Sequence, residues 1–452
     1  MFSAFINSWK IPELRKRILF TLGIVALARL GSYIPCPGID ATELNLWIDK
    51  QMGMVGGGAV GLAIMLTGGG LSRGAVFALG IMPYISATII MQLLTAVVPS
   101  LERLRQEGQS GYTKIIQYGR YMTVLICVIQ GFFAAKAFEH PSGILFPGFT
   151  GTLVQNPGIR FEILTVITMT SGGILLMWLG EQITEHGIGN GVSLIITIGI
   201  VDRLPSAIAQ AWALFFPGPG GQSQFNILHA ILLIVMAVAV TAGVVAVTEA
   251  QRKIPVQYAK RMVGRKMLGG GQTFMPLRVN YSGVMPIIFA QAILFFPQKI
   301  FSMSHMATLQ KLARALTEGE VLYLTLYGLM ILFFSYFWVA TQFNPLQIAD
   351  DLKKYGGYVP GIRPGRPTAE FLDHTMTRIT LAGAVFLTII AVIPYILSHN
   401  FRLPYLTASF FGGTSLLITV GVMLDTMRQV ESHLIMRHYD GFLRKGRLRG
   451  RR

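Results

Sequence analysis

The sequence predicts an all-α membrane protein with ten transmembrane helices, and two observations carry that prediction. Of its 452 residues, 52% are hydrophobic and only 13% are charged, whereas soluble globular proteins carry about 25% charged residues. Apolar runs of the length that crosses a bilayer, about 20 residues, recur ten times, at 18–37, 74–98, 115–138, 162–181, 190–212, 226–248, 283–301, 320–343, 375–397 and 405–429. The composition therefore places the chain among membrane proteins.

The first helix, over 18–37, follows a basic stretch and so has the look of a signal peptide. No small-residue A-x-A pattern comes after it, and we expect it to be retained as a membrane helix. Later helices contain proline, as at Pro83, Pro286 and Pro394. Membrane helices tolerate such residues because neighbouring helices re-satisfy the freed backbone groups.

One apolar segment, residues 56–75, does not fit the pattern of spanning helices. Its apolar core, 60–66, is too short to cross a bilayer, and glycine triplets bracket it at 56–58 and 68–70. Irregular backbone does not occur in contact with lipid, so this piece has to be buried in protein or in a cavity. We interpret it as a re-entrant segment in the mouth of a central cavity; the alternative is an outer loop with an apolar half-turn.

The orientation follows from the distribution of Lys and Arg. The net charge is +17, and with the N-terminus inside, the predicted inner segments carry 28 Lys and Arg residues against 9 in the outer ones. Cytoplasmic loops are rich in these residues, so both termini are predicted to be cytoplasmic. Arg29 lies inside the first helix, where we expect it to face a partner helix near the outer surface.

The ten helices divide into two sets of five. The predicted parts are an N-terminal half (1–212) with the segment 56–75, a C-terminal half (213–430) with cytosolic loops 249–282 and 344–374, and a basic tail (431–452). An odd number of helices per half permits an inverted repeat, although no repeat is visible residue by residue.

Ionisable groups at membrane depth are scarce. The stretches 204–248, 321–349 and 403–424 contain no Asp, Glu, Lys or Arg, whereas ion-coupled transporters use such groups for their transport. Asp202 and Arg203 lie near a predicted helix end, where pairing or snorkelling explains them. Cys36 and Cys127 are read as small core residues. No HExxH, P-loop, CxxC pair or serine-nucleophile elbow is present, so we expect neither enzyme activity nor a metal or other cofactor.

Eight ordered stretches across nearly the whole chain resemble bacterial members of the SecY family. They are RLGSYIPCPGID (29–40), FALGIMPYISATIIMQLL (77–94), EGQSGYTKIIQYGRY (107–121), LGEQITEHGIGNGVSLII (179–196), QRKIPVQYAKR (251–261), PLRVNYSGVMPIIFA (276–290), NPLQIADDLKKYGGYVPGIRPGRPT (344–368) and FGGTSLLITVGVMLDTM (411–427). The resemblance implies two pseudo-symmetric five-helix halves around an hourglass pore. It also implies a protein-conducting channel that passes secretory polypeptides across the cytoplasmic membrane and releases transmembrane helices sideways into it.

The resemblance assigns four groups of residues in this chain. It places the pore ring at Ile81, Ile85, Ile196, Ile200, Ile288 and Ile418, which periodicity alone does not select. It places the plug on 56–75, including Val60, Leu62, Ile64, Leu66 and Arg73. The implied lateral gate includes Gln92, Gln130 and Asn280. The implied partner-binding loops contain Arg252, Lys260, Arg261, Arg265, Lys266 and Arg363, and a glycine triplet at 269–271 suggests a looser first tip than is usual in the family.

The resemblance also implies partners: the SecE and SecG subunits, the ATPase SecA, the ribosome, signal sequences and nascent polypeptides, and membrane lipid. Basic loops suit the phosphates of ribosomal RNA or an acidic motor surface. A secondary transporter of small solutes and an intramembrane enzyme are the alternatives, and the scarcity of buried acid and base groups disfavours both. Co-purification with a ribosome or a cytosolic ATPase, against solute uptake in liposomes, separates these classes.

Overall fold

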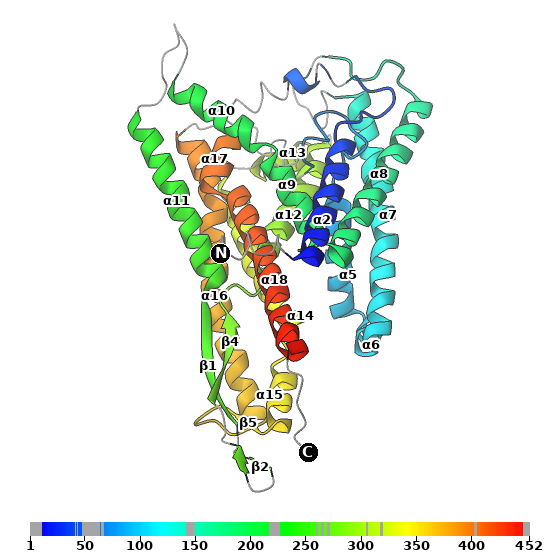
Figure 1. Ribbon diagram of the computed structural model, residues 1–452. Helices are drawn as coiled ribbons and strands as arrows, with labels where there is room; N and C mark the ends of the chain where they lie inside the picture. The colour runs from blue at the N-terminus through cyan, green and yellow to red at the C-terminus, as the bar shows by residue number, and fades with distance from the viewer. Residues whose placement is uncertain are drawn as a thin grey trace. The chain divides into compact units, whose positions relative to one another are not determined.

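A helix is present at each of the ten predicted positions (Figure 1). The computed structural model describes residues 11–40, 42, 44–47, 64, 67–141, 149, 151–216, 227–258, 261–263, 266–268, 272–303, 306–316, 320–401 and 405–445. Within these residues, seven helices are long and apolar enough to cross a membrane, or eight if a bent pair counts as one span. The prediction of a mainly helical, multi-span membrane protein is confirmed.

The chain divides into two compact units, each described here by itself. The first unit comprises Met1–Ile227, Arg402–Phe410 and Ile418–Arg452, and the second comprises Leu228–Phe401 and Phe411–Leu417. The helices of the first unit are α2 (Pro12–Gly31), α5 (Met82–Val97), α6 (Pro99–Gln106), α7 (Gln109–Glu139), α8 (Ile159–His186), α9 (Gly191–Val201) and α10 (Leu204–Phe215), with most of α18 (Thr414–Lys445). Those of the second unit are α11 (Ile227–Glu249), α12 (Met285–Met303), α13 (Ala307–Ala315), α14 (Val321–Gln342), α15 (Pro345–Lys354) and α16 (Arg366–Phe401); α17 (Tyr405–Gly412) straddles the boundary.

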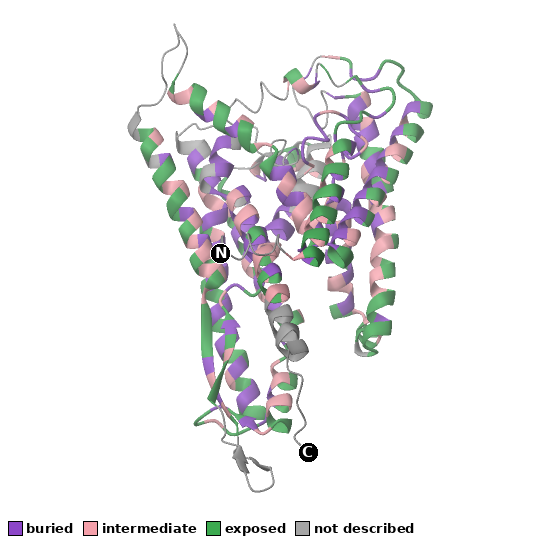
Figure 2. Cartoon of the chain, in the orientation of Figure 1, coloured by how far each residue is buried: buried purple, intermediate pink, exposed green. Residues whose placement is uncertain are grey.

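In the first unit, α7 and α8 run side by side and glycines allow close packing (Figure 1). A Cβ atom at Gly172 would lie 2.2 Å from the carbonyl oxygen of Val76, and one at Gly173 would lie 2.7 Å from Sγ of Cys127. Membrane helices associate through close packing, because lipid tails are as apolar as their side chains and provide no hydrophobic driving force. Small residues at the contacts allow this close approach. The buried side chains of Ile24, Phe77, Leu176, Leu179 and Ile183 form a hydrophobic core between α2 and α8. Buried positions recur along the helices of this unit, in purple in Figure 2.

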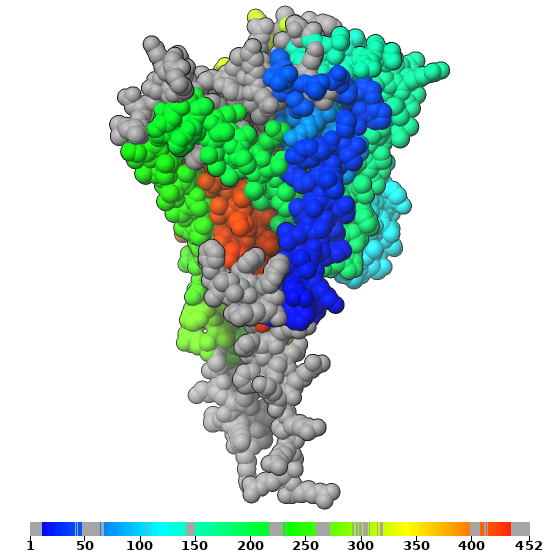
Figure 3. All heavy atoms as spheres, turned by 45° about the horizontal axis from the view of Figure 1, so that its top comes forward, coloured from blue at the N-terminus to red at the C-terminus, as the bar shows by residue number. Residues whose placement is uncertain are grey.

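The surface of the first unit exposes α2 over much of its length (Figure 3). Leu19, Leu22, Leu27 and Leu30 of this helix are all exposed. Exposed leucines on a helix of a membrane protein are ordinary lipid-facing residues, because lipid tails are as apolar as leucine.

Four of the predicted helices end early, start late or break; the tenth breaks at Gly413, between α17 and α18. The first ends at Gly31 rather than 37, because Pro35 and Pro37 follow and cannot continue a helix. The second starts at Met82 rather than 74, since Gly74 and Gly80 adopt positive φ angles in the turns before it. The fifth breaks at 202–203 into α9 and α10, where a proline occupies the first turn of α10.

The second unit contains strands that the sequence analysis did not predict. In the basic loop, β1 (Gln251–Tyr258) pairs antiparallel with β4 (Gln272–Arg278), so that Gln251 lies opposite Arg278. The short strand β5 (Gly357–Tyr358) joins the other side of β1, giving the order β4-β1-β5, and β2 (Arg261–Val263) pairs with β3 (Lys266–Leu268). Within the residues that the structure describes, the fold is therefore mainly helical with five strands in its basic loops.

A small hydrophobic core anchors this sheet to helices of its own unit. Ile254 and Val256 of β1 are buried while their neighbours are more exposed, as expected where one face of a sheet is covered. Ile254 and Leu277 pack against buried side chains from α14 and α16 and the intervening segments: Val339, Phe343, Val359, Leu372, Met376 and Ile379. The described strands β1 and β4 of the basic loop are thus packed as one module with α14 and α16.

Candidate functional site

The six isoleucines of the proposed pore ring are all buried, with exposed fractions between 1% and 6%. Ile81 is the N-cap of α5 and Ile85 lies in its first turn; Ile196 and Ile200 lie one turn apart on α9. Ile288 lies on α12 of the second unit, and Ile418 on α18 in the first. Within the first unit, Ile81 lines a cavity of about 30 Å³ together with Ile195, Ile198 and Gly199 of α9. The structure therefore brings the start of α5 against α9.

Helix α9 is fixed at its start by the glycine-rich turn before it. The side chain of Asn190 caps the helix by accepting a hydrogen bond from the backbone N–H of Ser193 at 3.2 Å. A Cβ at Gly191 would lie 1.9 Å from the carbonyl oxygen of Gly180, so only glycine permits this approach to α8. The backbone N–H of Gly189 donates to Oε1 of Gln429 on α18 at 2.8 Å. The turn thus sets the position of the two isoleucines on α9.

The segment 56–75 is described at Ile64 and from 67 onward, and Val60, Leu62 and Leu66 lie outside the described residues. The side chain of Ile64 is fully buried, and its carbonyl accepts hydrogen bonds from the backbone N–H of Gly69 and the hydroxyl of Thr67. The Arg73 guanidinium lies 3.9 Å from the centre of the Tyr33 ring, a cation–π contact. The described part of this segment is buried in protein, as its irregular backbone requires.

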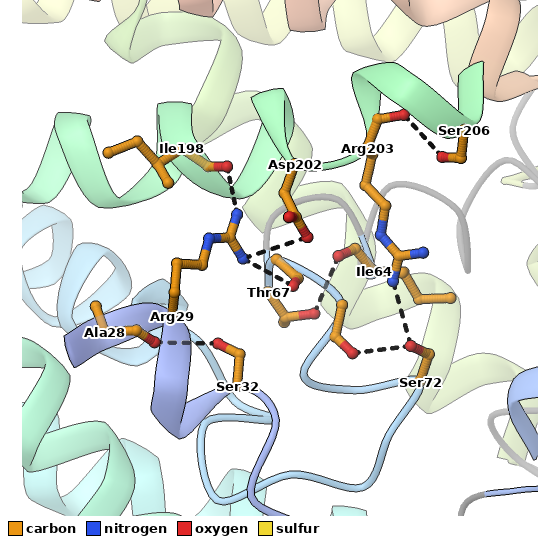
Figure 4. Close-up of polar contacts among 12 residues, drawn as sticks. Ala28, Arg29, Ser32, Ile64, Thr67, Ser72, Ile198, Asp202, Arg203 and Ser206 are labelled. Carbon is orange, nitrogen blue, oxygen red and sulfur yellow. Dashed lines mark hydrogen bonds and ion pairs between the residues drawn. The ribbon is translucent and has the colours of Figure 1, made fainter. Parts of the chain in front are cut away.

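Two arginines of the first unit contact this segment (Figure 4). Nη1 of Arg29 donates to the carbonyl of Gly68 at 3.0 Å, and Nη2 donates to the carbonyl of Ile198 on α9. The same guanidinium lies 3.7 Å from Oδ2 of Asp202. Nη2 of Arg203 donates to Oγ of Ser72 at 3.3 Å.

This arginine cluster confirms that Arg29 faces a partner helix, and it adds contacts that sequence reasoning missed. The available signal was one charge inside the first predicted helix and an Asp-Arg pair in the fifth. Nothing in the sequence indicated that Gly68 and Ser72, on the segment between helices one and two, would complete the cluster.

The three polar residues of the implied lateral gate lie in both units. Gln92 on α5 and Gln130 on α7 are partly buried in the first unit. Asn280, between β4 and α12 in the second unit, is buried, and its Oδ1 accepts a hydrogen bond from the hydroxyl of Ser282 at 3.3 Å.

The basic residues of the loops are described in part. Arg252 is exposed on β1, and Arg363 is exposed between β5 and α16, where its carbonyl accepts a hydrogen bond from the Thr368 hydroxyl at 2.8 Å. Arg261 and Lys266 belong to β2 and β3, whereas Lys260 and Arg265 lie outside the described residues. Across the described parts of the chain, no group of three or more His, Cys, Asp and Glu residues could hold a metal ion.

Comparison with known proteins identifies the family of the chain. The SecY family model matches residues 75–427. The protein translocase subunit SecY of Thermotoga maritima is 43% identical over 457 residues, covering all of both chains. That of Streptomyces scabiei is 44% identical over 455 residues, covering 98% of this chain and 100% of the relative.

Solved structures share the fold at lower identity. One described as a protein-conducting channel has a TM-score of 0.57 at 18% identity, covering 98% of this chain and 99% of that chain. Another, of Sec61 in a canine ribosome-channel complex, has a TM-score of 0.55 at 17% identity, covering 96% of this chain and 94% of that chain. The chain therefore belongs to the SecY family and is the protein-conducting channel subunit of a Sec translocase.

Proposed function

We propose that the channel narrows at a collar formed by Ile81, Ile85, Ile196, Ile200, Ile288 and Ile418. The observation that carries this proposal is that all six side chains are buried although they come from four different helices, α5, α9, α12 and α18. A hydrophobic constriction excludes ions by dewetting. Branched aliphatic side chains also yield around polypeptides of varied shape without offering them strong binding sites.

The collar is tested by placing an amide in it. Ile81→Asn and Ile418→Asn should each raise the ion conductance of reconstituted channels and permit export of a protein with a crippled signal sequence, because the amide favours water in the collar. Ile81→Leu keeps the collar apolar, and Ile163→Asn places the same amide on an exposed position of α8; both should behave like the parent. Parental conductance and parental signal discrimination in both collar variants would show that these isoleucines are ordinary packing residues.

The segment 56–75 is proposed to close the outer side of the channel at rest and to move aside during transport. The burial of Ile64 and the cluster around Gly68 and Ser72 support this role. One solved structure of the same fold, with a TM-score of 0.57 at 17% identity, is described as showing that the plug domain of SecY stabilises the closed state and maintains a membrane seal. Deleting 60–66 should raise the ion leak without abolishing translocation, and an unchanged leak would contradict the assignment.

Lateral release of apolar helices is proposed to occur at a gate that includes Gln92, Gln130 and Asn280. A signal sequence is itself an apolar helix, so the channel has to open toward lipid as well as across the membrane. Polar side chains between membrane helices contribute about 0.6 to 2 kcal/mol each, which is enough to bias a gate without locking it.

The partners follow from the same family assignment. The curated relatives are named as translocase subunits, and a structure of the same fold was solved in a ribosome-channel complex. We infer that SecE and SecG are membrane partners, that SecA and the ribosome dock on the basic loops, and that signal sequences, nascent chains and lipid contact the pore and gate.

The location is inferred from the distribution of charge and from the bacterial relatives. We place the protein in the bacterial cytoplasmic membrane with both termini in the cytoplasm, because Lys and Arg concentrate in the segments that this orientation puts inside. The pseudo-symmetric halves 1–212 and 213–430 remain a prediction, and a tag accessibility assay at both termini tests the orientation.

A further inference from the structure

We propose that Arg29 is a positioning residue that holds residues 67–75 of the segment 56–75 against the carboxyl end of α9. The contact thereby sets how stable the closed state of the channel is. This inference rests on the proposed collar and plug. It concerns the arm 67–75, which is described, and the cluster in Figure 4.

The guanidinium of Arg29 serves two backbone segments at once. Nη1 donates to Gly68 on the arm and Nη2 donates to Ile198 on α9. Ile198 lies between Ile196 and Ile200 of the proposed collar. One side chain therefore connects the arm to the helix that carries two collar residues.

The site favours a cation for two further reasons. Arg29 lies in the last turn of α2 and against the last turn of α9, the negative end of the helix dipole. Asp202, directly after α9, adds a carboxylate 3.7 Å away.

The glycines of the arm explain why the contact is so close. Gly68 and Gly69 have φ angles of +61° and +81°, a region that favours glycine. A Cβ at Gly68 would lie 2.5 Å from Nη1 of Arg29, and one at Gly69 would lie 2.3 Å from Nη2 of Arg203. Gly68 and Gly69 are therefore closely packed against two guanidinium groups, and any side chain at Gly68 has to displace Arg29.

The cluster can release residues 67–75 without leaving the Arg29 guanidinium short of hydrogen-bond partners. A cavity of about 30 Å³ lies beside Arg29 and is also lined by Ser32, Thr67, Gly68 and Ile81. One water molecule needs roughly 10–15 Å³ of such volume and polar partners, and Arg29, Ser32 and Thr67 supply them. When the Gly68 carbonyl leaves, a water molecule can take its place on Nη1, while Ile198 and Asp202 keep Arg29 on α9.

Four variants test the inference in reconstituted channels, with resting ion conductance, export of a protein with a crippled signal, and thermal unfolding measured for each. Arg29→Gln should raise the resting conductance roughly tenfold, which corresponds to about 1.4 kcal/mol, the size of one lost hydrogen bond to a charged group. The resting conductance of Arg29→Lys should lie between that of the parent and that of Arg29→Gln. The charge is kept, but a compact ammonium reaches two separate carbonyls less well than the planar guanidinium does. Asp202→Asn should have the smallest effect, since both carbonyl contacts remain. Gly68→Ala should leak like Arg29→Gln, although the arginine is intact.

Two control variants separate positioning from mere destabilisation. Gly23→Ala repeats the glycine substitution on α2 where a Cβ would meet no atom within 4 Å. Arg120→Gln removes an ion-paired arginine between α7 and α8, away from the arm. Gly23→Ala should match the parent, and Arg120→Gln should unfold at lower temperature without leaking.

The outcomes distinguish this inference from the proposed function. Leak in Ile81→Asn with parental conductance in both Arg29→Gln and Gly68→Ala would overturn the role of Arg29 and leave the collar standing. Arg29→Gln with lowered stability and no more leak than Arg120→Gln would make Arg29 a structural residue only. Parental conductance in the collar and arginine variants alike would refute both. If Arg29→Gln does not accumulate, Arg29→Lys and Gly68→Ala decide the question by the same conductance.

Discussion

Arg120 of α7 and Glu181 of α8 contact each other at two points, with Nε 3.0 Å from Oε1 and Nη2 2.9 Å from Oε2. Such a planar, two-point contact is the strong form of an arginine–carboxylate pair. The Glu181 side chain is 15% exposed and that of Arg120 is 43% exposed. The pair therefore joins two long helices of the first unit while one partner is largely withdrawn from solvent.

Replacing Arg120 with Gln should lower the stability of the protein by roughly 1–2 kcal/mol, between the values for exposed and buried pairs. The cause is that Glu181 keeps its charge in a largely buried place without its partner. Thermal unfolding in detergent measures the change. Lys354→Gln is the control, because its pair with Asp351 is exposed on both sides, and an equal loss in both variants would argue against the burial effect.

Replacing Gly172 with Ala should disrupt the packing of α8, because the added Cβ would lie 2.2 Å from the backbone oxygen of Val76. Overpacking of this kind typically costs about 1–3 kcal/mol, and a backbone oxygen cannot turn away as a side chain can. The yield of folded protein and its unfolding temperature report the effect. Gly119→Ala should be tolerated, since its nearest neighbour is Cγ of Met91 at 3.9 Å.

Reversing the charge of Arg363 should weaken SecA-driven translocation and ribosome binding if the basic loops dock these partners. Arg363 is exposed, and the hydrogen bond from Thr368 to its carbonyl holds its backbone in place. Arg366→Glu makes the same change in net charge three residues away, at an exposed arginine that already pairs with Glu370 at 3.4 Å. Arg363→Glu should impair docking more than this control, and unchanged values for both activities would remove the proposal.

Replacing Gln92 with Leu should shift the proposed lateral gate and change how strong a signal sequence must be for export. The loss of one polar group at the seam amounts to about 0.6 to 2 kcal/mol. Export of a graded series of signal sequences measures the shift. Thr325→Val, which removes an exposed polar group from α14, should leave the series unchanged, and a parental series in Gln92→Leu would exclude this residue from the gate.

The helices of this protein were predictable because hydrophobic length alone determines which segments can cross a bilayer. The residues at which the helices begin and end were harder to predict. The prolines at 35 and 37 were visible in the sequence, yet an X-Pro step in a membrane protein either ends or only bends a helix, depending on what re-satisfies the backbone. Pro205 ends α9 at a break, whereas Pro297 and Pro394 lie inside α12 and α16.

The strands of the basic loop escaped prediction for a different reason. In β1, buried Ile254 and Val256 alternate with polar neighbours and with Pro255, and Lys and Arg make up seven of the 34 residues of the loop 249–282. The pairing partner β5 lies about a hundred residues further along the chain, so the sheet depends on contacts that no local pattern contains.

The arginine cluster depends even more on the tertiary fold. Arg29 and Asp202 are far apart in the sequence, and the ion pair appears only once α2 and α9 are neighbours. The family resemblance selected the collar isoleucines, but it drew attention to side chains, whereas Arg29 acts mainly on the carbonyls of Gly68 and Ile198.

The pairing of β1 with β4 has a mechanical consequence. Seven residue pairs form the ladder, which is therefore roughly 20 Å long at the usual rise per strand residue. The N–H of Val279 donates to the carbonyl of Ala250 at 2.9 Å, so the pairing continues to the residue next to α11. The hydrogen bonds run perpendicular to the strands, and bending the ladder would make the two strands slide past one another, which all of these bonds resist together. If a cytosolic partner docks on this ladder as proposed, a displacement of the ladder would reach α11 at its base instead of being lost in bending.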